Sequence, residues 1–106
     1  MRVVVLAPDL LDRSRISAVI PDAEVVDAAA GLTAAAVGAD LVVVDLTRAG
    51  VVESLPALVA AAADVVGFGP HVEVDLLAAA SAAGARALPR SRFFADVAAA
   101  CGSVHG

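Results

Sequence analysis

One aspartate stands where a buried strand is expected to end, and its side chain could do chemistry. Asp45 directly follows three consecutive valines, so we expect its carboxylate to emerge from a sheet into a loop. A carboxylate there could bind Mg²⁺ together with water and phosphate oxygens, or accept a phosphoryl group. The alternative is a polar strand end whose oxygens are satisfied by loop amides, as in many loops without a function.

A second candidate is the glycine-rich segment Gly67-Phe-Gly-Pro-His71. Gly67 and Gly69 would allow close backbone approach, and His71 would lie beside the start of a helix, where N–H groups favour anions. Arg90 and Ser91 could add contacts to a carboxylate or phosphate at the same edge. The alternatives are an ordinary turn with a surface histidine and a solvated helix start, because no complete phosphate-binding fingerprint is present.

Other catalytic chemistry has little support in the sequence. His71 and His105 have no partners at zinc-ligand spacing, and no G-x-S-x-G nucleophile motif occurs. Cys101, the single cysteine, is expected inside a helix as a buried packing residue. We therefore expect a protein that is not an enzyme.

The elements that must position these residues alternate along the chain. Short apolar runs predict five strands, over 2–7, 24–27, 40–45, 64–68 and 86–88. Capping residues and helical spacing predict five helices between and after them. Asp9 is expected to cap the first helix, Ser54 the third and Ser91 the last, while Gly38 and Gly84 end helices.

Strands that alternate with helices predict an α/β fold: a doubly wound, five-stranded parallel sheet in three layers. Ligands of such sheets bind at the carboxyl ends of the strands. Asp9, Asp45, the segment 67–71 and Arg90 should all converge on that edge. We expect one domain over residues 1–101 and a frayed end over 102–106.

Composition narrows the classes of function. The chain is 60% hydrophobic but 3% aromatic, which suits an aliphatic sheet buried on both faces. A net charge of −5 argues against nucleic-acid binding. No apolar stretch is long enough for a membrane span, and the start does not read as a signal peptide. We expect a cytoplasmic protein that binds neither nucleic acid nor membrane.

The pattern resembles the response-regulator receiver family over nearly the whole chain. The matching features are a first strand running into Pro8-Asp9, a third strand ending in Asp45, the segment 77–85, and Phe93 followed by Val97. The resemblance implies a flavodoxin-like sheet with strand order 2-1-3-4-5. It also implies that Asp45 is the phosphoacceptor and that Asp9, Asp45 and Thr47 are candidate Mg²⁺ ligands.

Four positions depart from the receiver pattern. Pro8 replaces one member of the acidic pair, Gly69 replaces the hydroxyl residue after the fourth strand, and Leu88 replaces the aromatic residue of the fifth. The lysine position falls on Arg90 or Ser91, and neither reproduces an ammonium group. These departures predict a degenerate receiver, or pseudo-receiver, in which phosphoryl switching is inefficient.

The main hypothesis is therefore a stand-alone receiver-like signalling domain that acts through protein–protein contact and needs no cofactor. One alternative is a genuine response regulator that a histidine kinase or small phosphodonor phosphorylates on Asp45 with Mg²⁺. Another is a sensor of a small anion or other ligand at Gly67–His71. The resemblance also implies a contact or homodimer surface on the fourth helix, fifth strand and last helix, carrying Val72, Leu76, Arg86, Phe93 and Phe94.

Overall fold

The computed structural model describes residues 1–102 of the 106. Gly102 belongs to the described part and closes the last helix with a right-handed helical backbone. The remainder of the predicted frayed end, 103–106, lies outside the described residues.

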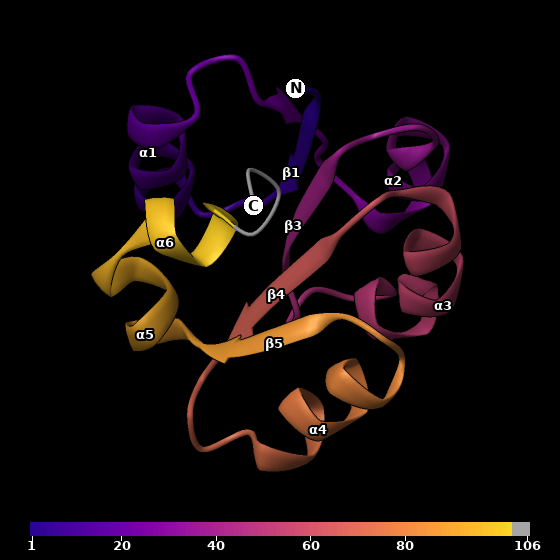
Figure 1. Cartoon of the computed structure of the whole chain (residues 1–106). Helices are drawn as coiled ribbons and strands as arrows, with labels where there is room; N and C mark the ends of the chain where they lie inside the picture. Colours follow the sequence, from indigo (N-terminus) through magenta and orange to yellow (C-terminus); the bar gives the residue numbers. More distant parts are fainter. Residues whose placement is uncertain (103–106) are drawn as a thin grey trace.

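A single sheet of five parallel strands forms the middle layer (Figure 1). Its order is β2-β1-β3-β4-β5, which confirms the predicted doubly wound α/β class and topology. The strands are β1 (Val3–Leu6), β2 (Glu24–Val25), β3 (Leu41–Asp45), β4 (Val65–Gly69) and β5 (Arg86–Pro89).

Helices cover both faces of the sheet (Figure 1). The helices α2 (Ala29–Ala36), α3 (Val51–Ala61) and α4 (Val74–Ala82) pack on one face. The helices α1 (Leu10–Val19), α5 (Arg90–Ala95) and α6 (Val97–Cys101) pack on the other. No helix within residues 1–102 is long and apolar enough to cross a membrane.

The central strand β3 is buried on both faces, which explains its continuous aliphatic sequence. Val42 and Val44 join the core under α2, α3 and α4, whereas Leu41 and Val43 join the core under α1, α5 and α6. Because side chains alternate along a strand, a one-residue shift in register would exchange the two sets. The register therefore determines how Asp45 leaves the sheet.

Two predicted helix starts are wrong. Helix α3 begins at Val51 after Gly50, whose φ of 81° is left-handed, and Ser54 lies inside the helix. There the Ser54 hydroxyl donates a hydrogen bond of 2.7 Å to the Gly50 carbonyl instead of capping a helix. The last helix is divided at Asp96, which caps α6 by accepting from the Ala99 N–H, and Ser91 lies within α5 rather than before it.

The glycine-rich segment begins in β4, as the predicted strand over 64–68 implied, and the strand continues one residue further, to Gly69. Gly67 and Gly69 both belong to β4, where they pair with β5 opposite Ala87 and Pro89. A Cβ placed on Gly67 would lie 2.5 Å from a methyl carbon of Leu46, a side chain that is itself buried. Close packing on Leu46 therefore explains Gly67 without a ligand.

Replacing Gly67 with alanine should destabilise the protein by about 1–3 kcal/mol, because the buried Leu46 has little room to move away. Gly31→Ala is the matched control: its new Cβ would approach nothing closer than 3.7 Å, and alanine favours helix α2. Urea unfolding of both variants measures the difference. Equal stabilities would contradict this account of Gly67.

Candidate functional site

Asp45 ends β3 and is nearly buried, with 5% of its surface exposed. Its Oδ1 accepts hydrogen bonds from the Thr47 backbone N–H at 3.0 Å and from the Thr47 hydroxyl at 2.7 Å. Its Oδ2 forms an ion pair with Arg48 at 3.4 Å. Both oxygens thus have donors from the loop that follows the strand, as the structural interpretation of this aspartate expected.

Asp9 is the N-cap of α1, as predicted. Its Oδ1 accepts from the backbone N–H groups of Leu11, at 2.9 Å, and Asp12, at 3.1 Å. The Asp12 N–H is the main reason that the pKa of the Asp9 carboxyl lies below its ordinary value, because a hydrogen bond to the charged form stabilises it. Asp9 is therefore a carboxylate at the carboxyl edge of the sheet.

Asp12 is the residue of this site that sequence reasoning missed as a site residue. It lies in the first turn of α1 and is 1% exposed. Its Oδ1 accepts a hydrogen bond from the guanidinium of Arg90, while its Oδ2 is buried without a partner in the described structure. An acid three residues after an N-cap is ordinary in a helix, and its partner lies 78 residues away, so no local signal marked it.

Arg90 is held by rings as well as by charge. Its guanidinium lies 5.6 Å from the centre of the Phe68 ring and 5.0 Å from that of Phe94, within cation–π range. The hydrogen bond with Asp12 raises the pKa of Arg90 above its ordinary value, and the charges of Asp45 and Asp9 act in the same direction. Arg90 is thus the cation that faces all three carboxylates.

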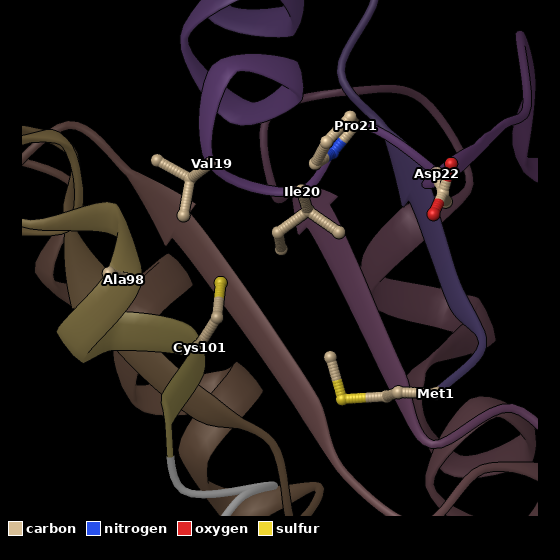
Figure 2. A pocket seen from close by; sticks show the side chains of 7 residues that line it. All are labelled: Met1, Val19, Ile20, Pro21, Asp22, Ala98 and Cys101. Carbon is tan, nitrogen blue, oxygen red and sulfur yellow. The ribbon is translucent and has the colours of Figure 1, made fainter.

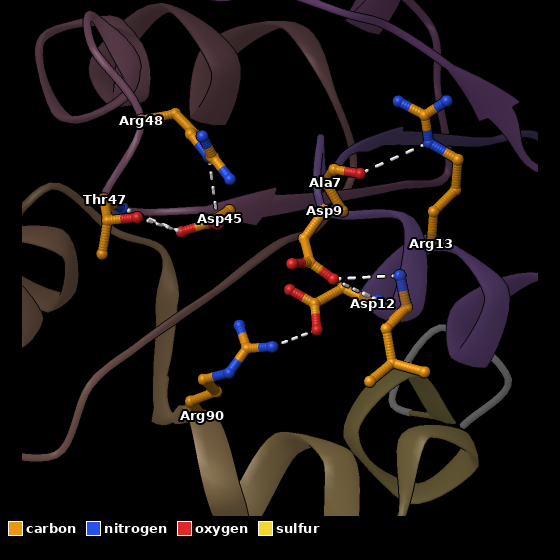
Figure 3. A network of polar contacts seen from close by, with 9 residues as sticks. Ala7, Asp9, Asp12, Arg13, Asp45, Thr47, Arg48 and Arg90 are labelled. Atoms are coloured by element: carbon orange, nitrogen blue, oxygen red, sulfur yellow. Dashed lines mark hydrogen bonds and ion pairs between the residues drawn. The ribbon is translucent and has the colours of Figure 1, made fainter.

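Figure 3 shows this polar network at the edge of the sheet. The carboxylates of Asp9 and Asp12 point toward the side where Arg90 and Asp45 lie, and Arg48 approaches Asp45 from the opposite side. Strand β3 and the loop after it, helix α1 with its N-cap, and helix α5 supply these residues, although they are distant in the sequence. The predicted convergence of Asp9, Asp45 and Arg90 is therefore observed.

The other residues predicted for an anion site at this edge do not belong to the charged network. Gly67 and Gly69 are buried strand residues, His71 is exposed beyond the end of β4, and Ser91 is exposed in α5. The fifth residue of the predicted anion edge is Arg90. It alone among the five belongs to the network of hydrogen bonds and ion pairs that Figure 3 draws.

The carboxylates do not fit Mg²⁺ in this arrangement. Within residues 1–102, no group of three histidine, cysteine, aspartate or glutamate side chains is placed to hold a metal ion. The Thr47 hydroxyl donates to Asp45, and guanidinium groups pair with Asp45 and Asp12. A cation at this edge would therefore meet two positive charges among its prospective ligands.

Only some of the residues predicted for the contact surface are exposed. Phe93 does not belong to it, because its side chain is fully buried against Phe68. Leu76 packs partly on the core, and Arg86 binds Asp64 and donates to the Ala100 carbonyl. Val72 remains exposed, at 71%. The other predicted member, Phe94, is half-buried, with its ring edge-on to Phe68 and to Phe93.

A pocket of about 480 Å³ lies away from these carboxylates, at the amino ends of the strands (Figure 2). It is lined by Met1, Val19, Ile20, Pro21, Asp22, Ala98 and Cys101. Burial raises the pKa of the Cys101 thiol, which favours its neutral form. The surroundings of Cys101 thus suit a packing residue, as predicted.

A smaller hollow of about 350 Å³ lies at the carboxyl edge, between the loops that follow β1 and β3. Pro8, Arg48 and Ala49 line it together with Leu6 and residues 27–29. Strand order reverses here, since β1 and β3 are neighbours in the sheet. The hollow therefore borders the charged network on the Arg48 side.

The two partners of the Asp12–Arg90 pair should contribute unequally to the free energy of unfolding. Arg90→Met leaves both oxygens of the buried Asp12 unpaired, so we expect a loss of about 3 kcal/mol. Asp12→Asn leaves Arg90, whose side chain is 41% exposed, to be solvated, so we expect about 1 kcal/mol. Urea unfolding in buffer with EDTA measures both, and an equal or reversed order would contradict the assigned roles.

No protein-family model and no curated protein matches the chain. Among solved structures, the chain is similar to a response regulator from Hahella chejuensis, with a TM-score of 0.75 and 22% sequence identity. The similarity covers 92% of this chain and 89% of that one. The chain therefore has the fold of a response-regulator receiver.

Proposed function

We propose that this chain is a receiver-like signalling domain that acts by contact with another protein and does not switch efficiently by phosphorylation. The main support for the proposal is that the charged groups at the carboxyl edge are already paired with one another. Asp45 is 5% exposed and already bonded to Thr47 and Arg48, while Arg90 is engaged by Asp12. A phosphoryl donor would have to displace the partners of Asp45 before it reacted.

Two side chains that would respond to phosphorylation of Asp45 are also missing. A receiver switch works when a local charge moves a bistable element. Gly69 ends β4 without a hydroxyl, and Leu88 in β5 packs against the core that holds Phe93. A phosphoryl group on Asp45 would therefore find no hydroxyl at the end of β4 to attract and no ring in β5 to rotate. We also propose that the protein has no enzymatic activity.

A surface must then carry the signal. Val72, in the turn before α4, and Val74, the first residue of α4, are 71% and 67% exposed, and Phe94 lies half-buried on α5. Aromatic side chains are enriched and charged side chains are depleted at the cores of protein–protein interfaces. We propose this part of the α4–β5–α5 face as the contact surface and a second copy of the chain as its occupant.

Incubation with acetyl phosphate and Mg²⁺ should leave the mass of the intact protein unchanged, because the oxygens of Asp45 are held internally. An active receiver treated in parallel shows that the donor is competent. Asp45→Asn is the matched variant for locating an adduct. A phosphoryl adduct in the wild type that disappears in this variant would support the alternative, a phosphorylated response regulator served by a histidine kinase.

Light scattering after size exclusion tests the contact surface. We expect the wild type to form a dimer and Val72→Asp to shift it to monomer, because a buried unpaired carboxylate opposes association. Val37→Asp is the control, since Val37 is similarly exposed, at 64%, but follows α2. A monomeric wild type, or equal effects of both substitutions, would count against this face.

A further inference from the structure

The pocket between the end of α1 and α6, called here the amino-end pocket, lies at the opposite end of the sheet from Asp45 (Figure 2). Its volume of about 480 Å³ falls within the range of small-molecule sites, about 300–1,000 Å³. The end of α1 contributes Val19 and its C-cap Ile20, while α6 contributes Ala98 and Cys101. The pocket therefore has walls on two neighbouring helices.

Most of the wall of the amino-end pocket is apolar. Met1 and Val19 are 60% and 44% exposed, although both side chains are apolar. The Cys101 side chain is buried and points from α6 toward the end of α1 (Figure 2), and burial raises the pKa of its thiol, which favours the neutral form. Thioether and neutral thiol groups adapt to irregular apolar surfaces. An apolar body that covered this wall would release water from it favourably.

Asp22 is the charged residue of the amino-end pocket. Its side chain is exposed, and within residues 1–102 its carboxylate has no hydrogen bond or ion pair. Asp27, by comparison, is paired with Arg13 in an exposed position nearby in the sequence. The net charge of −5 acts in the same direction as Asp22, because it attracts cations and repels anions. The charge of the pocket thus complements a positive group.

We infer that the amino-end pocket binds a small amphiphilic cation, an alkylammonium compound, whose apolar chain lies between α1 and α6 and whose ammonium group lies beside Asp22. This site goes beyond the proposed function, since it uses neither Asp45 nor the α4–β5–α5 face. The apolar wall supplies most of the affinity, and Asp22 selects the sign of the charge. Because Asp22 is exposed, its loss should weaken binding only about two- to five-fold.

An NMR titration with octylammonium chloride, below its micelle concentration and at constant ionic strength, tests the inference. We expect saturable shifts of the amide signals of Val19, Ile20, Ala98 and Cys101. The same compound should slow alkylation by N-ethylmaleimide, which reports on the pocket because Cys101 is the single cysteine. Octanoate has an apolar chain of similar length and the opposite charge, so it should bind several-fold more weakly.

Two substitutions in α6 form a matched pair. Ala98→Leu places a larger side chain in the amino-end pocket and should abolish the saturable shifts. Ala99→Leu makes the same change at the next residue, which is also exposed but lines a different hollow, and it should bind octylammonium as the wild type does. Asp22→Asn should weaken octylammonium binding and bring the affinity for octanoate closer to it.

Three outcomes would overturn the inference. Octylammonium shifts that do not saturate, or that persist unchanged in Ala98→Leu, would show that the compound does not occupy the pocket. Equal affinities for octylammonium and octanoate in the wild type would remove the role of Asp22. Shifts of the same amide signals that grow with protein concentration in the absence of any ligand would assign the pocket to a second copy of the chain.

Discussion

Burial of β3 on both faces is the constraint on which the rest of the structure depends. A parallel strand in the middle of a sheet needs helices above and below it, and Val42, Val43 and Val44 supply apolar surface to both sides. Their alternation sets the register of β3 against β1 and β4. That register places the next residue, Asp45, at the carboxyl edge, where the other strands also end and the loops that follow them begin.

The Asp12–Arg90 pair then connects the first helix to the fifth at this edge. Asp12 belongs to α1, which follows the first strand, and Arg90 begins α5, which follows the last. Phe68 at the end of β4 contributes a ring beneath the guanidinium. One cation thus connects three elements, so its removal affects packing as well as charge.

Much of the fold could be predicted because its signals are local and periodic. Aliphatic runs marked the strands, and Asp9 marked the start of α1. Ser54 and Ser91 misled because a capping residue is recognised by type, whereas Gly50 could begin α3 earlier through a left-handed backbone. The glycines here suggested a ligand site for a related reason. Gly67 was correctly placed in a strand, but the sequence did not show that Leu46 crowds it, and β4 continues to Gly69.

The site was predictable only as far as topology determines it. Strand ends in a parallel sheet converge, so Asp45, Asp9 and Arg90 could be placed together without coordinates. Their chemistry depends on which side chain pairs with which, and the decisive partner, Asp12, had to be buried by tertiary packing before it could hold Arg90. Pro8 suggested the loss of one carboxylate from this edge. Asp12 supplies another from one turn further along the chain, and Arg90 pairs with it.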